Sequence, residues 1–143
     1  MSEQTDQRVA FITGASRGIG SAIAHAVAAQ GRHVVLVARN EEKLNHVRQS
    51  ISDSGGSAEV CVCDIGDSAA LEAAIESVAK ERKRLDIVVN NAGITRDNLL
   101  LRMTDEEFDE VVRVNLRSVF VACRASLRPM MRGKWGRIVN LGS

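Results

Sequence analysis

Three glycines near the N-terminus have the spacing of a phosphate-binding loop. Gly14, Gly18 and Gly20 form a G-x-x-x-G-x-G pattern between a short apolar run and a helical pattern. Such a loop uses one glycine for a tight turn, one for close approach of a pyrophosphate and one for packing of helix on strand. Free N–H groups at the helix start then face the phosphates. We expect a dinucleotide here rather than only a structural turn, with further contacts from Ser16, Arg17 and Ile19.

The second predicted strand ends in residues that favour NADP(H) over NAD(H). An NAD site has Asp or Glu about 20 residues after the loop, where it binds the ribose 2′-hydroxyl. This sequence has Ala38 and Arg39 there, and neither side chain repels a 2′-phosphate. Arg39 and Arg17 could pair with such a phosphate through bidentate hydrogen bonds. The alternative is that both arginines are only solvated.

The elements that position these residues alternate between short apolar runs and helical patterns. Strands are predicted at residues 8–13, 33–38, 58–63, 85–90 and 137–141, and helices at 18–30, 40–52, 67–82 and 104–131. This alternation predicts an α/β fold, a doubly wound parallel sheet (Rossmann) in the order 3-2-1-4-5. Residues 1–7 are expected to form a polar tail and residues 8–143 the nucleotide-binding domain. Any ligand should lie at the carboxyl ends of the first and fourth strands.

Asn115 stands out within the long helix predicted at residues 104–131. At about 100° per residue it falls on an apolar face together with four other residues: Phe108, Val111, Val119 and Ala122. A buried amide without a partner costs about 1–3 kcal/mol, so this asparagine needs a reason to be there. One reason is hydrogen bonding to neighbouring backbone.

The composition is that of an ordinary globular domain. The chain has 143 residues, of which 45% are hydrophobic and 26% charged, and a formal net charge of +1. Its longest apolar runs are far below the about 20 residues of a membrane span, and its N-terminus lacks an apolar signal core. We therefore predict a cytoplasmic protein with no membrane contact; a chain made without its targeting segment is the alternative. Cys61 and Cys63 are interpreted as strand core rather than half of a metal site, and no metal is predicted.

Four motifs in order resemble the short-chain dehydrogenase/reductase family. They are Thr-Gly-x-x-x-Gly-x-Gly at 13–20, Cys-Asp-Ile at 63–65, Asn-Asn-Ala-Gly at 90–93 and Val-Asn-Leu at 114–116. Within the family, residues 91–100 and 136–143 are most similar to 3-oxoacyl-[acyl-carrier-protein] reductases, and acetoacetyl-CoA reductases share much of this stretch. The resemblance implies reduction of a 3-oxoacyl thioester by NADPH in fatty acid synthesis. A short-chain reductase of another carbonyl substrate is the alternative.

The resemblance also implies roles for particular residues. Asp64 would accept a hydrogen bond from the adenine amine while the Ile65 backbone contacts the ring, although Asp64 could be only a turn residue. Asn115 would hold a proton-relay water at a helix distortion, and Ser143 would bind the substrate carbonyl. The end of the fourth strand would line the cofactor with four residues: Asn91, Ala92, Gly93 and Ile94. Asn91 could also tie neighbouring strands together.

The sequence departs from the family at the catalytic Tyr-x-x-x-Lys pair. The family places this pair after the serine that corresponds to Ser143, and the sequence contains no tyrosine. The interpretation we favour is a partial record of a longer reductase. A split protein and a short protein that only binds cofactor are the alternatives. The fifth strand would be an unprotected edge, so we expect the 143-residue chain alone to be poorly soluble or to pair with something.

The segment from residue 113 to 137 is strongly basic. It contains seven basic and no acidic side chains. The alternatives are a solvated face, a dock for an acidic partner such as acyl carrier protein through Arg128, Arg132 and Lys134, or an interface of a family-type homotetramer. Nucleic acid is not an expected partner, because the segment lacks interleaved aromatic residues and the net charge is small.

Overall fold

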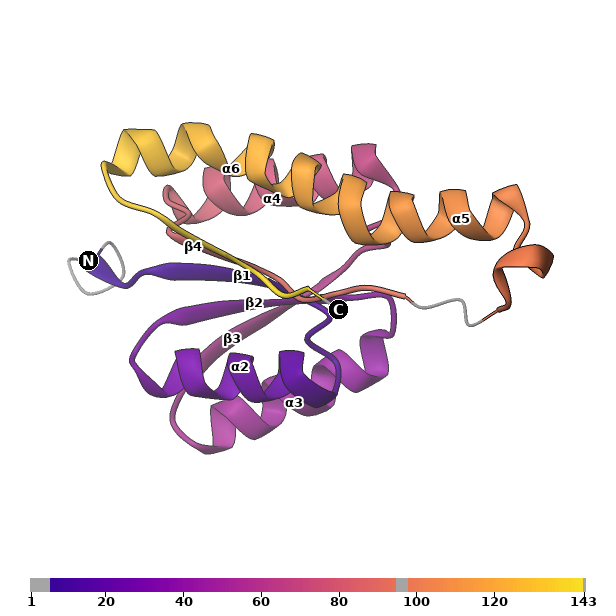
Figure 1. Ribbon diagram of the computed structural model, residues 1–143. Coiled ribbons are helices and arrows are strands. Elements are labelled where there is room, and N and C mark those ends of the chain that lie inside the picture. Colours follow the sequence, from indigo (N-terminus) through magenta and orange to yellow (C-terminus); the bar gives the residue numbers. More distant parts are fainter. Residues whose placement is uncertain (1–5, 95–97, 143) are drawn as a thin grey trace.

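The computed structural model describes residues 6–94 and 98–142, which form a parallel sheet covered by helices on both faces (Figure 1). The sheet has five strands in the order β3-β2-β1-β4-β5. The strands are β1 (Val9–Thr13), β2 (His33–Ala38), β3 (Ser57–Val62), β4 (Ile87–Asn90) and β5 (Arg137–Asn140). This topology confirms the predicted doubly wound fold and its strand order.

The helices divide between the two faces of the sheet. Figure 1 shows α2 (Gly18–Ala29) and α3 (Glu41–Asp53) on one face, and α4 (Ser68–Arg82), α5 (Asp105–Val111) and α6 (Ser118–Gly133) on the other. A 3-10 helix, η1 (Leu100–Arg102), precedes α5, and a π-helical segment, η2 (Val112–Arg117), joins α5 to α6. The long helix predicted over residues 104–131 is therefore present, with a π-helical segment in its middle.

Side-chain caps explain where three helices begin. Asn40 Oδ1 accepts from Lys43 N at 3.0 Å, Asp67 Oδ1 from Ala70 N at 3.1 Å, and Thr104 Oγ1 from Glu107 N at 3.1 Å. Each contact satisfies one N–H group that the first helical turn leaves free. The C-terminal ends are less usual, since α4 and α6 end in left-handed lysines, Lys83 at φ 61° and Lys134 at φ 56°.

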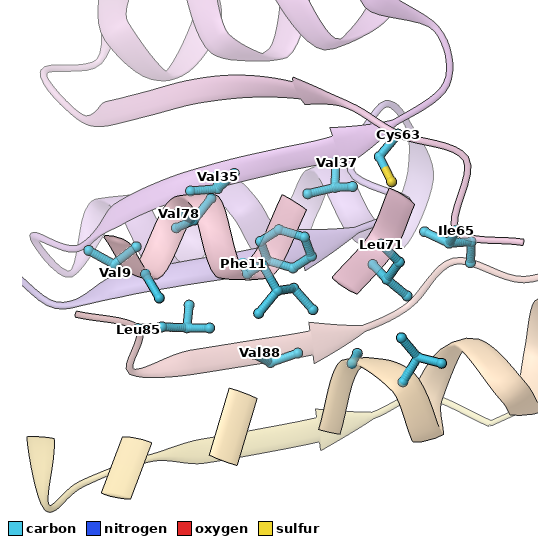
Figure 2. Packing of buried hydrophobic residues seen from close by; sticks show 14 of the residues in the cluster. Val9, Phe11, Val35, Val37, Cys63, Ile65, Leu71, Val78, Leu85 and Val88 are labelled. Atoms are coloured by element: carbon cyan, nitrogen blue, oxygen red, sulfur yellow. The ribbon is translucent and has the colours of Figure 1, made fainter. Parts of the chain in front are cut away.

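The two central strands form the middle of two apolar layers. All of β1 and all of β2 except its last residue are buried, as expected for parallel strands covered on both faces. On one face, Phe11 and Val88 pack with Leu71 of α4 (Figure 2). On the other face, Ile12 packs in a second cluster that includes Leu44 of α3. Both layers end at the carboxyl edge of the sheet, where the loops begin.

The two edge strands are less covered than the centre. β3 is partly buried along most of its length, whereas on β5 Val139 is 49% exposed, and Leu141 after it is 41% exposed. An apolar parallel edge of this kind favours pairing with further chain. The solubility prediction rests on this edge and stays a prediction.

Candidate functional site

A cavity of about 1030 Å³ lies at the carboxyl ends of the strands, where the fold places ligands. Its volume is large enough for a cofactor-sized ligand. Apart from Gly20, every residue predicted to contact the cofactor lines it: Gly14, Ser16, Arg17, Gly18, Ile19, Arg39, Asp64, Ile65, Asn91, Ala92, Gly93 and Ile94. The fold thus brings together four segments that are far apart in the sequence.

Two glycines of the loop are required by packing. A Cβ on Gly20 would lie 2.0 Å from Gly14 O, and one on Gly14, where φ is +64°, would lie 2.8 Å from Asn91 Nδ2. Gly20 therefore lets α2 approach β1 closely, which is why it lies behind the cavity wall. Gly18 differs, because a Cβ there would have no atom within 4 Å. No side chain caps the N-terminus of α2 at Arg17. The first N–H groups of α2 are therefore available to a ligand in the cavity.

Hydrogen bonds between Thr13, Gly14 and residues 91–92 hold the glycine loop against the end of β4. Thr13 Oγ1 accepts from Asn91 N at 3.0 Å and from Ala92 N at 3.1 Å. Asn91 Nδ2 donates to Gly14 O at 3.2 Å. The predicted tie between neighbouring strands through Asn91 is therefore present. It fixes the backbone of residues 91–93 along one wall of the cavity.

Basic side chains gather at the end of β2. Arg39 is exposed there, and Arg17 of the glycine loop lines the same cavity. Lys43 also lines it from the first turn of α3, and the sequence analysis missed this residue. The predicted helix cap at Asn40 could have indicated Lys43, because the cap fixes where α3 begins and therefore which residues of its first turn face the end of β2.

The loop after β3 forms the opposite wall. Asp64 Oδ1 accepts from Gly66 N at 2.9 Å, so the turn role considered for this residue is present. Asp64 is also exposed and lines the cavity, which leaves its second oxygen available to a ligand. Cys63 lines the cavity too, but burial, with Cys61 and nearby carboxylates adding, raises the pKa of its thiol to about 11. A thiol in that state is not a nucleophile near neutral pH.

Asn115 lies in η2 and binds the backbone beyond β4. Its Oδ1 accepts from Ile94 N at 2.7 Å and its Nδ2 donates to Ile94 O at 2.8 Å. Neighbouring backbone thus satisfies the amide, which was one of the two explanations considered. The distortion that the resemblance implied is also present, as a π-helical segment.

The predicted apolar face around Asn115 was partly wrong. Phe108 is 59% exposed, whereas Val121 is 2% and Ala122 0% exposed. A π-helical turn contains about one residue more than a regular turn, so the residues that share a face of α5 and α6 are shifted relative to a constant helical spacing. Constant helical spacing therefore cannot align Phe108 with Ala122.

The predictions for Ser143 and for the N-terminal tail concern residues at the two ends of the chain. Ser143 lies outside the described residues, as do residues 1–5 of the predicted tail. Over residues 6–94 and 98–142 no group of three possible metal-ligating side chains occurs, and no helix in this part is long and apolar enough to span a bilayer. The cysteines are free thiols.

Comparison with known proteins identifies the class of protein. A family model described as short chain dehydrogenase matches residues 8–143, and the chain belongs to this family. This confirms the resemblance inferred from the four motifs.

Particular relatives carry more specific names. The chain is 44% identical over 137 residues to 3-oxoacyl-[acyl-carrier-protein] reductase FabG of Escherichia coli (strain K12), covering 95% of this chain and 54% of that protein. It is 40% identical over 136 residues to the reductase of the same name from Haemophilus influenzae, covering 95% and 55%. The chain therefore spans about half the length of the curated relatives it matches.

Solved structures agree with the fold at similar identity. A metagenomic short-chain oxidoreductase in complex with NADP superposes with a TM-score of 0.92 at 41% identity, covering 95% of this chain and 62% of that one. A variant of actinorhodin polyketide ketoreductase with NADPH gives a TM-score of 0.91 at 33% identity, covering 97% and 54%.

Proposed function

We propose that the cavity at the carboxyl edge of the sheet binds NADP(H). The observation that carries this proposal is the uncapped N-terminus of α2 beside the glycine loop, with basic side chains at the end of β2. The pyrophosphate would meet the free N–H groups of α2. Arg39, Arg17 and Lys43 would neutralise the 2′-phosphate. The cavity volume and the absence of an acid at the end of β2 fit this cofactor.

The remaining walls fit the other parts of the cofactor. Asp64 and Ile65 would hold the adenine ring, and the nicotinamide would lie towards Gly93 and Ile94. Bound NADPH is the source of a hydride for a carbonyl carbon. Asn115 would keep Ile94 in place and support a proton relay, and Ser143 would bind the substrate carbonyl.

We further propose that the protein reduces a 3-oxoacyl thioester to the 3-hydroxyacyl form. The names of the curated relatives support this substrate class. The family's proton donor is a tyrosine, and the 143 residues contain none. A second candidate is therefore cofactor binding without catalysis by this chain, and the missing phenol is the observation that favours it.

Two exposed surfaces support proposals about partners. Arg128, Arg132 and Lys134 are exposed near the end of α6 and would bind the acidic surface of an acyl carrier protein. The outer face of α5, η2 and α6 is apolar, and we propose that it packs against a second copy in a homo-oligomer, a tetramer in the whole protein. Its exposed side chains are Phe108 (59%), Leu116 (66%), Phe120 (59%), Leu127 (51%) and Met131 (72%).

The free thiols support a reducing compartment, for which we propose the cytoplasm.

Calorimetry and an activity assay on material of verified mass test these proposals. We expect the 143-residue chain to bind NADPH at least about tenfold more tightly than NADH, a difference of about 1.4 kcal/mol. Equal affinities would contradict the cofactor assignment. Oxidation of NADPH with acetoacetyl-CoA separates the two functions. Turnover by this chain would overturn the assignment of the proton to a tyrosine, and binding without turnover would support the second candidate.

A further inference from the structure

We propose that Arg113 is a positioning residue for the adenine side of the cavity, an inference that rests on the proposed NADP(H) binding. Arg113 lies in η2, and its Nη1 donates to Gly66 O at 3.0 Å. Gly66 belongs to the loop after β3 that also contains Asp64 and Ile65. The contact therefore joins a helix to a loop 47 residues away in the sequence.

Both polar backbone groups of Gly66 are held by side chains. Its N–H donates to Asp64 Oδ1 at 2.9 Å, and its carbonyl accepts from Arg113. A Cβ on Gly66 would lie 2.5 Å from Arg113 Nη1 and 3.2 Å from Asp64 Oδ1, so both side chains pack directly against this residue. Because Gly66 is buried, its carbonyl needs a partner inside the protein. The guanidinium supplies that partner and thereby fixes the turn that carries Asp64.

Arg113 is exposed, but its contacts differ from those of the other exposed arginines of this segment. Its side chain lines the cavity together with Asp64 and Ile65. Within the part of the chain that the structure describes, it forms no ion pair. Arg117, four residues later in the same segment, is equally classed as exposed but does not line the cavity. Arg117 is therefore a matched control of the same residue type in the same segment.

The position of Arg113 also connects the two ends of the cavity. Asn115 in the same segment holds the backbone of Ile94, which lines the proposed nicotinamide end. Arg113 holds the loop at the adenine end. One π-helical segment thus positions two walls, and loss of Arg113 should loosen only the adenine wall. Affinity for a ligand that contains only the adenine half should then fall as much as affinity for NADPH.

The test measures binding of NADPH and of 2′,5′-ADP to the full chain by calorimetry. Loss of a hydrogen bond from a charged group predicts that Arg113→Ala binds both ligands about tenfold or more weakly. Arg113→Lys keeps a cationic donor with different geometry, so we expect an affinity between those of wild type and Arg113→Ala. Arg117→Ala should bind as wild type does. Circular dichroism and the melting temperature establish that each variant is folded.

The outcomes separate this inference from the proposed function. If the wild-type chain binds neither ligand, the proposed function fails. If the wild type binds and Arg113→Ala binds equally well, or loses affinity for NADPH but not for 2′,5′-ADP, the role of Arg113 is refuted. An equal loss in Arg117→Ala refutes it too. If Arg113→Ala does not fold, Arg113→Lys decides: weaker 2′,5′-ADP binding at an unchanged melting temperature supports the role, and wild-type affinity contradicts it.

Discussion

The amino ends and the carboxyl ends of the strands contain similar polar and charged residue types, but these side chains make different contacts. At the amino ends of the strands, polar side chains pair with one another. Asp86 is 3% exposed and accepts from Val9 N at 2.8 Å and from Arg84 Nε at 2.7 Å. At the carboxyl ends, Arg17 and Arg39 line an open cavity beside an uncapped helix.

Two further contacts at the amino edge continue this pattern. His33 lies between Ser57 Oγ at 2.6 Å and Glu59 Oε1 at 3.0 Å. Two guanidinium groups lie near the ring of Trp135, with the Cζ atoms of Arg8 and Arg137 at 3.6 and 4.7 Å from the ring centroid. The first set of contacts joins the start of β2 to β3, and the second joins the segment before β1 to the start of β5. The comparison teaches that one edge of the sheet stabilises the fold, while the other leaves polar groups available for a ligand.

Gly20→Ala should have the largest effect on this comparison. The new Cβ would lie 2.0 Å from Gly14 O, which is backbone and cannot move without displacing the loop. We expect at least an about 100-fold loss of NADPH affinity, and an unfolding free energy lower by about 3 kcal/mol, measured by calorimetry and urea denaturation. Gly133→Ala is the control, because a Cβ there would meet no atom within 4 Å. Wild-type binding by Gly20→Ala would refute the packing role.

Asp86→Ala should affect stability without affecting binding. The substitution removes the buried carboxylate that accepts from Val9 N and from Arg84 Nε. We expect the unfolding free energy to fall by about 3 kcal/mol, with unchanged affinity for NADPH in the folded protein. Asp105→Ala is the control at an exposed position, and its unfolding free energy should stay within about 0.5 kcal/mol of that of wild type. A selective loss of cofactor affinity in Asp86→Ala would contradict the division between the two edges.

Arg39→Asp should affect binding without affecting stability. It places a carboxylate at the end of β2, where it repels a 2′-phosphate and can accept from a ribose hydroxyl. We expect NADPH affinity to fall about tenfold or more, NADH affinity to be kept or increased, and the melting temperature to stay unchanged. Lys80→Asp, on the exposed face of α4, makes the same charge change away from the cavity. An unaltered ratio of the two affinities in Arg39→Asp would show that this arginine is only solvated.

Glu59→Gln should produce a smaller effect that depends on pH. The hydrogen bond with His33 lowers the pKa of the Glu59 carboxyl below 4.5; burial opposes this shift, and Arg82 adds to it. Because the pKa is lower in the folded state, the stabilisation is fully present above pH 4.5 and is lost as the pH falls through the folded value.

The deficit of Glu59→Gln relative to wild type should therefore shrink between about pH 6 and about pH 3, as measured by urea denaturation. Glu72→Gln removes an exposed pair with Arg124 at 3.6 Å and should change stability by less than about 1 kcal/mol. A deficit of Glu59→Gln that grows on acidification would contradict the assigned direction.

The fold could be predicted because local signals and hydrophobic patterning agreed. Apolar runs such as that in β2 and caps such as Asn40 each gave the same alternation of strands and helices. Only the family resemblance implied a distortion at the η2 segment. The residue pattern alone did not predict it, because its extra residue accompanies a hydrogen-bonded contact between Asn115 and Ile94, 21 residues apart in the sequence. The contact of Arg113 with the cavity was missed for a related reason. Whether a long basic side chain reaches a cavity depends on the rotation of its helix, and a single sequence does not give that rotation.

The left-handed lysines at the ends of α4 and α6 identify a place to engineer the protein. Lys83 and Lys134 have φ angles of 61° and 56°, a region in which a residue with a Cβ is strained by about 1–2 kcal/mol. Glycine relieves this strain but makes the unfolded chain more flexible. We therefore expect Lys83→Gly and Lys134→Gly each to raise the unfolding free energy by up to about 1 kcal/mol. Both positions lead into the amino edge of the sheet, far from the cavity. Lys83→Gly could therefore raise thermal stability without reducing ligand binding, whereas Lys134→Gly would also remove a side chain of the proposed contact with acyl carrier protein.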